Sequence, residues 1–305
     1  MELQIILNQM AVLFILMAVG FGLGKLNVLT QEGNKILSRI ILFLALPALI
    51  ITAVLDTEIT ITISSTLVFL LISFLTIFVG ILIAYPLIRL LGGDKANRGL
   101  LCYMSVFGNT AYMGIPVVIA IFGFSAAFYA ALFNIAFSIL TFSFGIMMVS
   151  KDGRKFNPKL LLNPTLIISI LAIPLTLGNV TFPLPIAQAL RLTGSLTTPT
   201  AMLVIGSTLS FVPIKTVLSE WRVMPMTLLK LVVVPVVTWL IFRLFITDEM
   251  LLGILVVLSA MPTAVAASMI AIEYGSDEQL ASAGVFLTTL LCGITVPLLL
   301  WFIFI

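Results

Sequence analysis

The sequence predicts an all-α membrane protein with ten transmembrane helices, arranged as two inverted five-helix repeats. Its composition, the length of its apolar runs and the placement of its cations predict this fold. Of the 305 residues, 61% are hydrophobic and 9% are charged, whereas soluble domains carry about 25% charged residues because their surface faces water. Such a chain is expected to lie in a bilayer.

The apolar residues form continuous runs rather than the alternating ten-residue strands of a membrane barrel. A bilayer core about 30 Å thick requires about 20 apolar residues per helix, and the sequence divides into ten runs near that length. The predicted spans are residues 5–24, 36–55, 64–91, 99–122, 125–149, 160–177, 186–210, 223–246, 250–272 and 280–304.

Lysine and arginine are concentrated in or beside the loops after the first, third, fifth and seventh spans. They are Lys25, Lys35, Arg39, Arg89, Lys95, Arg98, Lys151, Arg154, Lys155, Lys159, Lys215 and Arg222. By the positive-inside rule these loops are cytoplasmic. The sequence therefore predicts a multi-pass protein of the plasma membrane with both termini on the extracytoplasmic side.

An odd number of spans before the midpoint inverts the second half of the chain. Pro47 and Pro199 occupy comparable places in spans two and seven, as do Pro116 and Pro262 in spans four and nine. Residues 1–150 are thus expected to form the first repeat and residues 151–305 the second, with the junction at 151–159. Paired interruptions in corresponding spans indicate a transporter's binding site.

Span four contains "FGNTAYMGIP", in which Pro116 removes a backbone donor and two glycines favour non-helical backbone. We expect this span to break between Gly108 and Pro116, with a new helix starting at Pro116. Its partner in span nine should restart near Pro262 and Thr263. Freed backbone groups in hydrocarbon are tolerated only inside protein or beside a watery cavity.

Two helix N-termini meeting in the interior suit a carboxylate or another anion, because each carries free N–H groups and about half a positive charge. Asn109, Thr110 and Thr263 can add polar side chains. The alternative is that Pro116 and Pro262 merely kink two ordinary packed helices.

Five stretches in order along the chain resemble the auxin efflux carrier family, which includes the PIN-type auxin transporters. They are "SRIILFLALPALI", "GNTAYMGIP", "NPTLIIS", "PTAMLVIGSTL" and "AMPTAVAASMIAIEYGSDEQLAS". The resemblance covers essentially the whole chain. One departure is that no long hydrophilic loop separates the halves, which indicates a compact prokaryotic-type member.

The resemblance implies ten helices in two inverted repeats, with spans four and nine crossing as broken helices. It also implies a homodimer and an elevator motion, with spans 1, 2, 6 and 7 as scaffold and spans 3–5 and 8–10 as transport domain. The family's crossover motif carries over to Asn109, Thr110, Gly114 and Pro116. Its second-repeat counterpart carries over to Pro262, Thr263, Ala264 and Val265.

Other polar residues within the spans allow two interpretations each. Asn134 and Ser138 share a helical face and either line a cavity or join packed helices. Lys230, about two turns into span eight, is either a functional intramembrane charge or a side chain that snorkels to the interface. Glu273, Asp277 and Glu278 either serve ion coupling or belong to a solvated loop that caps the next helix.

The sequence argues against an enzyme, because it lacks histidine and any P-loop, and its two cysteines lie apart inside spans. No acidic residue lies in the middle of a span, and sodium can instead bind carbonyls of unwound segments, so coupling to Na⁺ or H⁺ stays open. We predict a carrier for a small organic anion, such as a carboxylate or an auxin-like acid. A ligand-binding membrane receptor without transport is the alternative.

Overall fold

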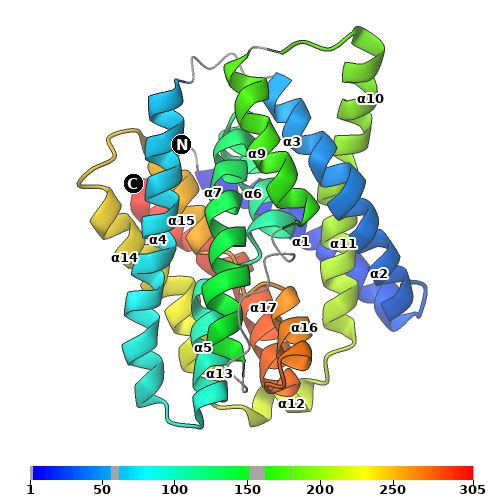
Figure 1. Ribbon diagram of the computed structural model, residues 1–305. Coiled ribbons are helices and arrows are strands. Elements are labelled where there is room, and N and C mark those ends of the chain that lie inside the picture. Colours follow the sequence, from blue (N-terminus) through cyan, green and yellow to red (C-terminus); the bar gives the residue numbers. More distant parts are fainter. Residues whose placement is uncertain (1–2, 56–61, 151–161, 179, 305) are drawn as a thin grey trace. The chain divides into compact units, whose positions relative to one another are not determined.

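A computed structural model describes residues 3–55, 62–150, 162–178 and 180–304 (Figure 1). Every regular element within these residues is a helix, so the predicted all-α class is confirmed. The predicted junction at residues 151–159 lies outside the described residues. The chain forms two units, of which unit 1 comprises Met1–Ile72, Ala111–Ile135 and Leu162–Phe211, and unit 2 comprises Ser73–Thr110, Ala136–Leu161 and Val212–Ile305.

Six helical stretches of the described chain are long and apolar enough to cross a membrane. They are Leu7–Lys25, Gln31–Ala53, Ile63–Leu90, Ala126–Val149, Val223–Phe242 and Glu278–Ile303. Shorter apolar helices occupy Thr110–Phe122, Pro164–Leu177 and Glu249–Ser259. Two of these short helices lie in spans four and nine, where the sequence predicts interruptions.

Unit 1 is built mainly from the spans at the start of each half of the chain. Its helices are α1 (Leu3–Lys25), α2 (Gln31–Ile40), α3 (Leu46–Leu55), α6 (Ile115–Phe122), most of α7 (Ala126–Leu140), α9 (Pro164–Leu177), α10 (Leu184–Ser195) and α11 (Thr197–Ser210). A π-helical turn, η1 (Ile41–Ala45), joins α2 to α3 without interrupting the helix.

The predicted span 186–210 is divided in the structure, because α10 and α11 meet at a turn around Leu196. Pro47 lies just after η1 inside the continuous helix Gln31–Ala53, whereas Pro199 lies in the first turn of α11. A proline is tolerated in a first turn because the N–H it lacks has no intrahelical acceptor there.

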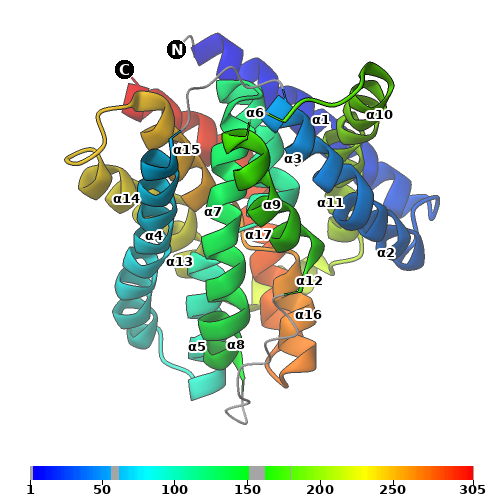
Figure 2. The ribbon, with the colours of Figure 1, turned by 45° about the horizontal axis from the view of Figure 1, so that its top comes forward.

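Helices α1 and α11 pack side by side along much of their length (Figures 1 and 2). The backbones approach so closely that a Cβ added to Gly206 would collide with the carbonyl of Met17. Small residues at such crossings are typical of membrane helices, where dispersion contacts rather than the hydrophobic effect drive association.

Unit 2 holds the remaining helices. They are most of α4 (Ile63–Leu90), α5 (Lys95–Val106), α8 (Ile146–Val149), α12 (Ile214–Ser219), α13 (Val223–Leu228), α14 (Val234–Phe242), α15 (Glu249–Ser259), α16 (Ala266–Glu273) and α17 (Glu278–Phe304). A π-helical turn, η3 (Thr141–Gly145), connects α7 to α8, and another, η5 (Leu229–Val233), connects α13 to α14.

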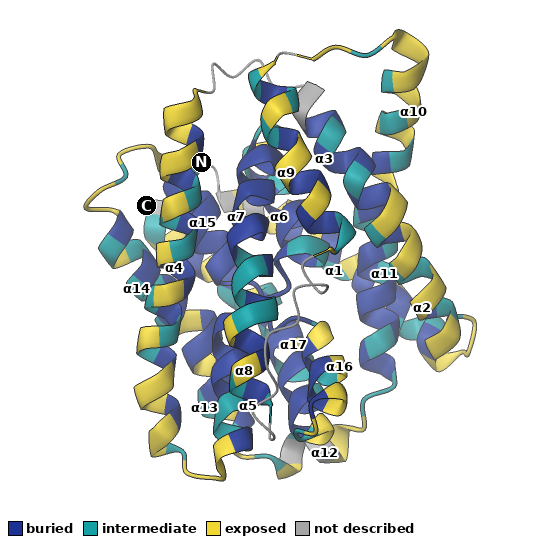
Figure 3. Cartoon of the chain, in the orientation of Figure 1, coloured by how far each residue is buried: buried dark blue, intermediate teal, exposed yellow. Residues whose placement is uncertain are grey.

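Exposed residues recur along helix α4 (Figure 3), and among them are the large apolar side chains of Leu67, Leu75 and Leu82. They follow one another at spacings of eight and seven residues, which places them on one side of a helix. A long apolar face of this kind suits lipid and would be a liability in water.

Candidate functional site

Helix α5 ends at Val106, in the middle of predicted span four. Phe107 adopts an extended conformation with φ −84° and ψ 100°, and the chain stays non-helical through Asn109. The observed break therefore overlaps only the start of the predicted interval from Gly108 to Pro116. The chain becomes helical again at Thr110, which begins the π-helical turn η2 (Thr110–Gly114).

The expected helix start at Pro116 is wrong. Pro116 is the second residue of α6, which follows directly on η2, so Gly114 and Pro116 both lie within helical backbone. The wider π-helical turn just before the proline brings the chain into α6. Both residues are buried in unit 1 rather than in the break itself.

The second break lies in predicted span nine, between the end of α15 at Ser259 and the start of α16 at Ala266. The expected restart near Pro262 and Thr263 is therefore some three residues too early. Pro262, Thr263 and Ala264 are buried parts of the non-helical segment, and Val265 is half-buried at the cap of α16.

The two breaks pair with each other inside unit 2. The Asn109 N–H donates to the carbonyl of Pro262 at 2.6 Å, and the Ala264 N–H donates to the carbonyl of Phe107 at 3.2 Å. Gly108 and Thr263 face each other between these bonds as an isolated antiparallel bridge. Each break thus supplies the other with one backbone acceptor, which replaces a bond lost where the helix is interrupted.

Thr263 fixes the second break to two helices. Its hydroxyl donates to the carbonyl of Met104 in α5 at 2.9 Å, and its N–H donates to Oγ1 of Thr288 in α17 at 3.1 Å. The Thr288 hydroxyl in turn donates to the Gly284 carbonyl at 2.7 Å. Buried hydroxyls of this kind replace helical bonds that the interruption removes.

Lys230, in the turn η5, reaches the same place. Its side chain is fully buried, and its Nζ donates to the carbonyls of Val106 at 2.9 Å and Ser259 at 3.1 Å. A Cβ added to Gly108 would lie 3.0 Å from that nitrogen. The snorkelling interpretation of Lys230 is therefore wrong, because the ammonium group turns inward to the ends of α5 and α15.

Of the predicted site residues, Asn109, Thr110, Pro262, Thr263 and Ala264 come together at or directly beside the paired breaks, with Val265 at their edge. Asn134 belongs to unit 1, where it is buried in α7 and its side-chain amide donates to the carbonyl of Ala130 at 2.9 Å. This bond lies within α7 and tests neither interpretation of Asn134.

The prediction from the sequence missed several residues that the structure places at the breaks. Thr288 and Met104 bind Thr263, while the terminal carbonyls of Val106 and Ser259 receive Lys230. No local pattern distinguishes Thr288 from other threonines in apolar helices. The depth of Lys230 within its span was the signal that pointed to its burial.

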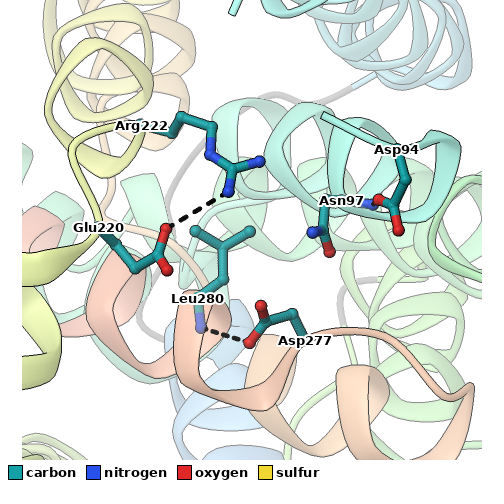
Figure 4. A network of polar contacts seen from close by, with 6 residues as sticks. All are labelled: Asp94, Asn97, Glu220, Arg222, Asp277 and Leu280. Carbon is teal, nitrogen blue, oxygen red and sulfur yellow. Dashed lines mark hydrogen bonds and ion pairs between the residues drawn. The ribbon is translucent and has the colours of Figure 1, made fainter. Parts of the chain in front are cut away.

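Polar side chains at one end of unit 2 serve helix termini. Asp277 accepts the Leu280 N–H at 3.0 Å at the start of α17, and Asp94 accepts the Asn97 N–H at 2.8 Å at the start of α5 (Figure 4). Arg222 and Glu220 form an ion pair at 3.7 Å nearby. Asp277 therefore acts as a cap, as the second interpretation of that acidic cluster proposes.

Unit 1 contains an apolar groove with a volume of about 470 Å³. It lies between α10 and the segment formed by η1 and α3, and Phe43, Pro47 and Ile186 are among its lining residues. None of the predicted site residues lines this groove.

The chain is similar to known membrane transporters over most of its length. Residues 5–300 match the family model described as "Membrane transport protein". An "Uncharacterized transporter" of Methanothermobacter thermautotrophicus is 24% identical over 290 residues, which are 93% of this chain and 94% of that protein. One from Methanocaldococcus jannaschii is 26% identical over 304 residues, 97% and 98% of the two chains. A "Putative malonate transporter" of Rhizobium meliloti is 27% identical over 213 residues, 66% of each chain.

Proposed function

Because this chain belongs to the membrane transport protein family, which it matches over residues 5–300, we propose that it is a secondary carrier for a small organic anion. The family and the relatives are transporters and not enzymes, which confirms the predicted class and the resemblance to auxin efflux carriers. The substrate class is a mono- or dicarboxylate or an auxin-like acid.

The proposed architecture is that of ten transmembrane helices in two inverted five-helix repeats, residues 1–150 and 151–305, with crossing breaks in spans four and nine. Spans 1, 2, 6 and 7 form the scaffold of a homodimer, and spans 3–5 and 8–10 move as an elevator. The carrier lies in the plasma membrane with both termini outside, as the placement of lysine and arginine supports.

The single observation that carries the proposal is the backbone pairing of Phe107–Asn109 with Pro262–Ala264. Two irregular segments held together inside a helical unit are the arrangement in which transporters bind substrate at broken helices. The exposed start of α16 at Ala266 presents a helix N-terminus beside the second break, and such an end favours a carboxylate.

Malonate is the first substrate to test, because the name of the Rhizobium relative supports a dicarboxylate. The experiment measures uptake of labelled malonate by proteoliposomes that contain the purified protein. We expect saturable uptake that unlabelled malonate competes away. Other labelled organic acids follow in the same assay, and flux with none of them would contradict a carrier for small organic anions.

Asn109→Ala should raise the KM for the transported acid by about tenfold or more, since a hydrogen bond to a charged group contributes about 1.5–3 kcal/mol. Asn97→Ala is the matched control, because Asn97 lies in the first turn of α5, away from the breaks. Equal KM values for the two variants would contradict the assignment of Asn109. Saturable binding without flux in either direction would instead indicate a receptor.

A further inference from the structure

Each break leaves a carbonyl without its helical partner at the last residue of a helix. In a continuous helix the Val106 carbonyl would accept the Thr110 N–H, but that group donates to Gly108 at 2.9 Å. The Ser259 carbonyl would accept the Thr263 N–H, which donates to Thr288 instead. The final residues of α5 and α15 thus hold carbonyls that have no helical partner.

The ammonium group of Lys230 is the hydrogen-bond donor to both carbonyls. It bonds both carbonyls, at 2.9 and 3.1 Å, and these two bonds are its polar contacts within the described part of the chain. Each helix C-terminus carries about half a negative charge. Two such ends together balance one buried positive charge, which would be very costly to bury without partners.

Carbonyls at half-helix C-termini are the ligands with which transporters built from discontinuous helices hold a sodium ion. Here the nitrogen of Lys230 occupies the position between two such carbonyls, with Gly108 leaving room for it because any Cβ there would lie 3.0 Å away. The side chain arrives from η5, a π-helical turn, and such turns are frequent at functional sites.

We propose that Lys230 is a built-in cation that holds the ends of α5 and α15 together, and that removing it uncovers a latent site for a small monovalent cation. In the native protein this place is filled, so no sodium ion is needed between these two helix ends. Lys230 is a positioning residue, which acts on the substrate site through the backbone of the two breaks. The inference rests on the proposed function only where it treats the paired breaks as a substrate site.

The test measures thermal unfolding of the purified protein in detergent, in choline chloride and in NaCl at equal ionic strength, with no substrate present. The native protein should have the same midpoint in both salts. Lys230→Ala should lower the midpoint in choline by about 5 °C or more, and NaCl should restore much of that loss in a saturable manner, because a bound ligand stabilises the folded state.

Two variants separate this role from a general effect of charge or packing. Lys230→Met fills the space without a cation and should stay destabilised in both salts. Lys215→Ala removes an exposed lysine from α12 and should leave the midpoint unchanged. If Lys230→Ala aggregates in choline, its recovery as a monodisperse protein in NaCl is the expected result.

Three results would overturn the inference. Na⁺ could raise the unfolding midpoint of the native protein as much as that of Lys230→Ala, or it could fail to stabilise or recover Lys230→Ala. The third such result is a Lys230→Met variant that is as stable as the native protein. Because no substrate enters the assay, a failure to transport malonate leaves these outcomes unaffected. The failure of the proposed function and that of the inference are therefore distinguishable.

Discussion

At the residue scale, the breaks are stabilised by a few side chains that replace lost helical hydrogen bonds. Thr263 bonds α5 through its hydroxyl and α17 through its N–H, and Lys230 bonds the ends of α5 and α15. All of these groups are buried. A buried donor without an acceptor costs about 1–3 kcal/mol. The loss of any one of these bonds is therefore expected to lower the free energy of unfolding.

Thr288→Val should destabilise the protein, because the buried N–H of Thr263 then loses its acceptor. The cost of about 1–3 kcal/mol should lower the midpoint of thermal unfolding by several degrees. Thr227→Val is the matched control, since the buried Thr227 hydroxyl has no hydrogen-bond partner among the described residues. A control variant that loses as much stability as Thr288→Val would refute this account of Thr263.

Gly108→Ala should be harmful although it adds one methyl group. The new Cβ would lie 2.9 Å from the Met261 carbonyl and 3.0 Å from the nitrogen of Lys230, and relieving such overpacking costs about 1–3 kcal/mol. Gly22→Ala, where nothing lies within 4 Å of the added atom, should leave the unfolding midpoint unchanged or raise it. Equal midpoints for the two alanine variants would contradict the close approach at Gly108.

The sequence could identify Asn109, Pro262 and Thr263 because glycine and proline disturb a helix locally. It could not assign the partners of these residues. Whether Lys230 snorkels or turns inward depends on carbonyls 124 and 29 residues away along the chain. Only the packed structure brings those groups within reach.

At the element scale, spans four and nine are each two helical pieces joined by a short non-helical segment. The sequence predicted the first break between Gly108 and Pro116, and it placed the restarts at Pro116 and near Pro262 and Thr263. The structure starts the new helices at Thr110 and Ala266 instead. Long-range bonds such as that from Thr263 to Met104 set where the backbone can become helical again.

The start of α17 depends on its cap, because Asp277 accepts the N–H of Leu280. Asp277→Ala should cost about 1 kcal/mol of stability, which a shift of the thermal midpoint would reveal. Asp277→Asn keeps an oxygen acceptor and should lose much less. The same loss in both variants would show that the aspartate acts through its charge rather than as a hydrogen-bonding cap.

At the scale of the whole molecule, the helical class and the membrane location followed from composition and run length alone. Within the described residues, six helical stretches are long and apolar enough to span a bilayer, and exposed leucines follow one face of α4. The turn around Leu196 was not predicted, although Gly194, Ser195 and Pro199 flank it in the sequence. The inverted repeat and the dimer remain proposals.

The orientation of the chain makes a separate prediction. Cysteines at Lys95 or Lys215 should react with an impermeant thiol reagent only after cells are permeabilised, since both lie in or beside regions predicted to be cytoplasmic. Cysteines at Phe124 or Thr247 should react in intact cells. All four positions are exposed, and the two native cysteines are buried. The opposite labelling pattern would invert the topology.

The central claim is that the paired breaks form the substrate site of a carrier, and the accessibility of Val265 tests it most directly. Val265 is half-buried at the edge of the second break. We predict that Val265→Cys reacts with impermeant thiol reagents applied from either side of the membrane, and that a transported acid slows both reactions. Reaction from one side only, unaffected by substrate, would contradict the claim and would favour a fixed binding site without transport.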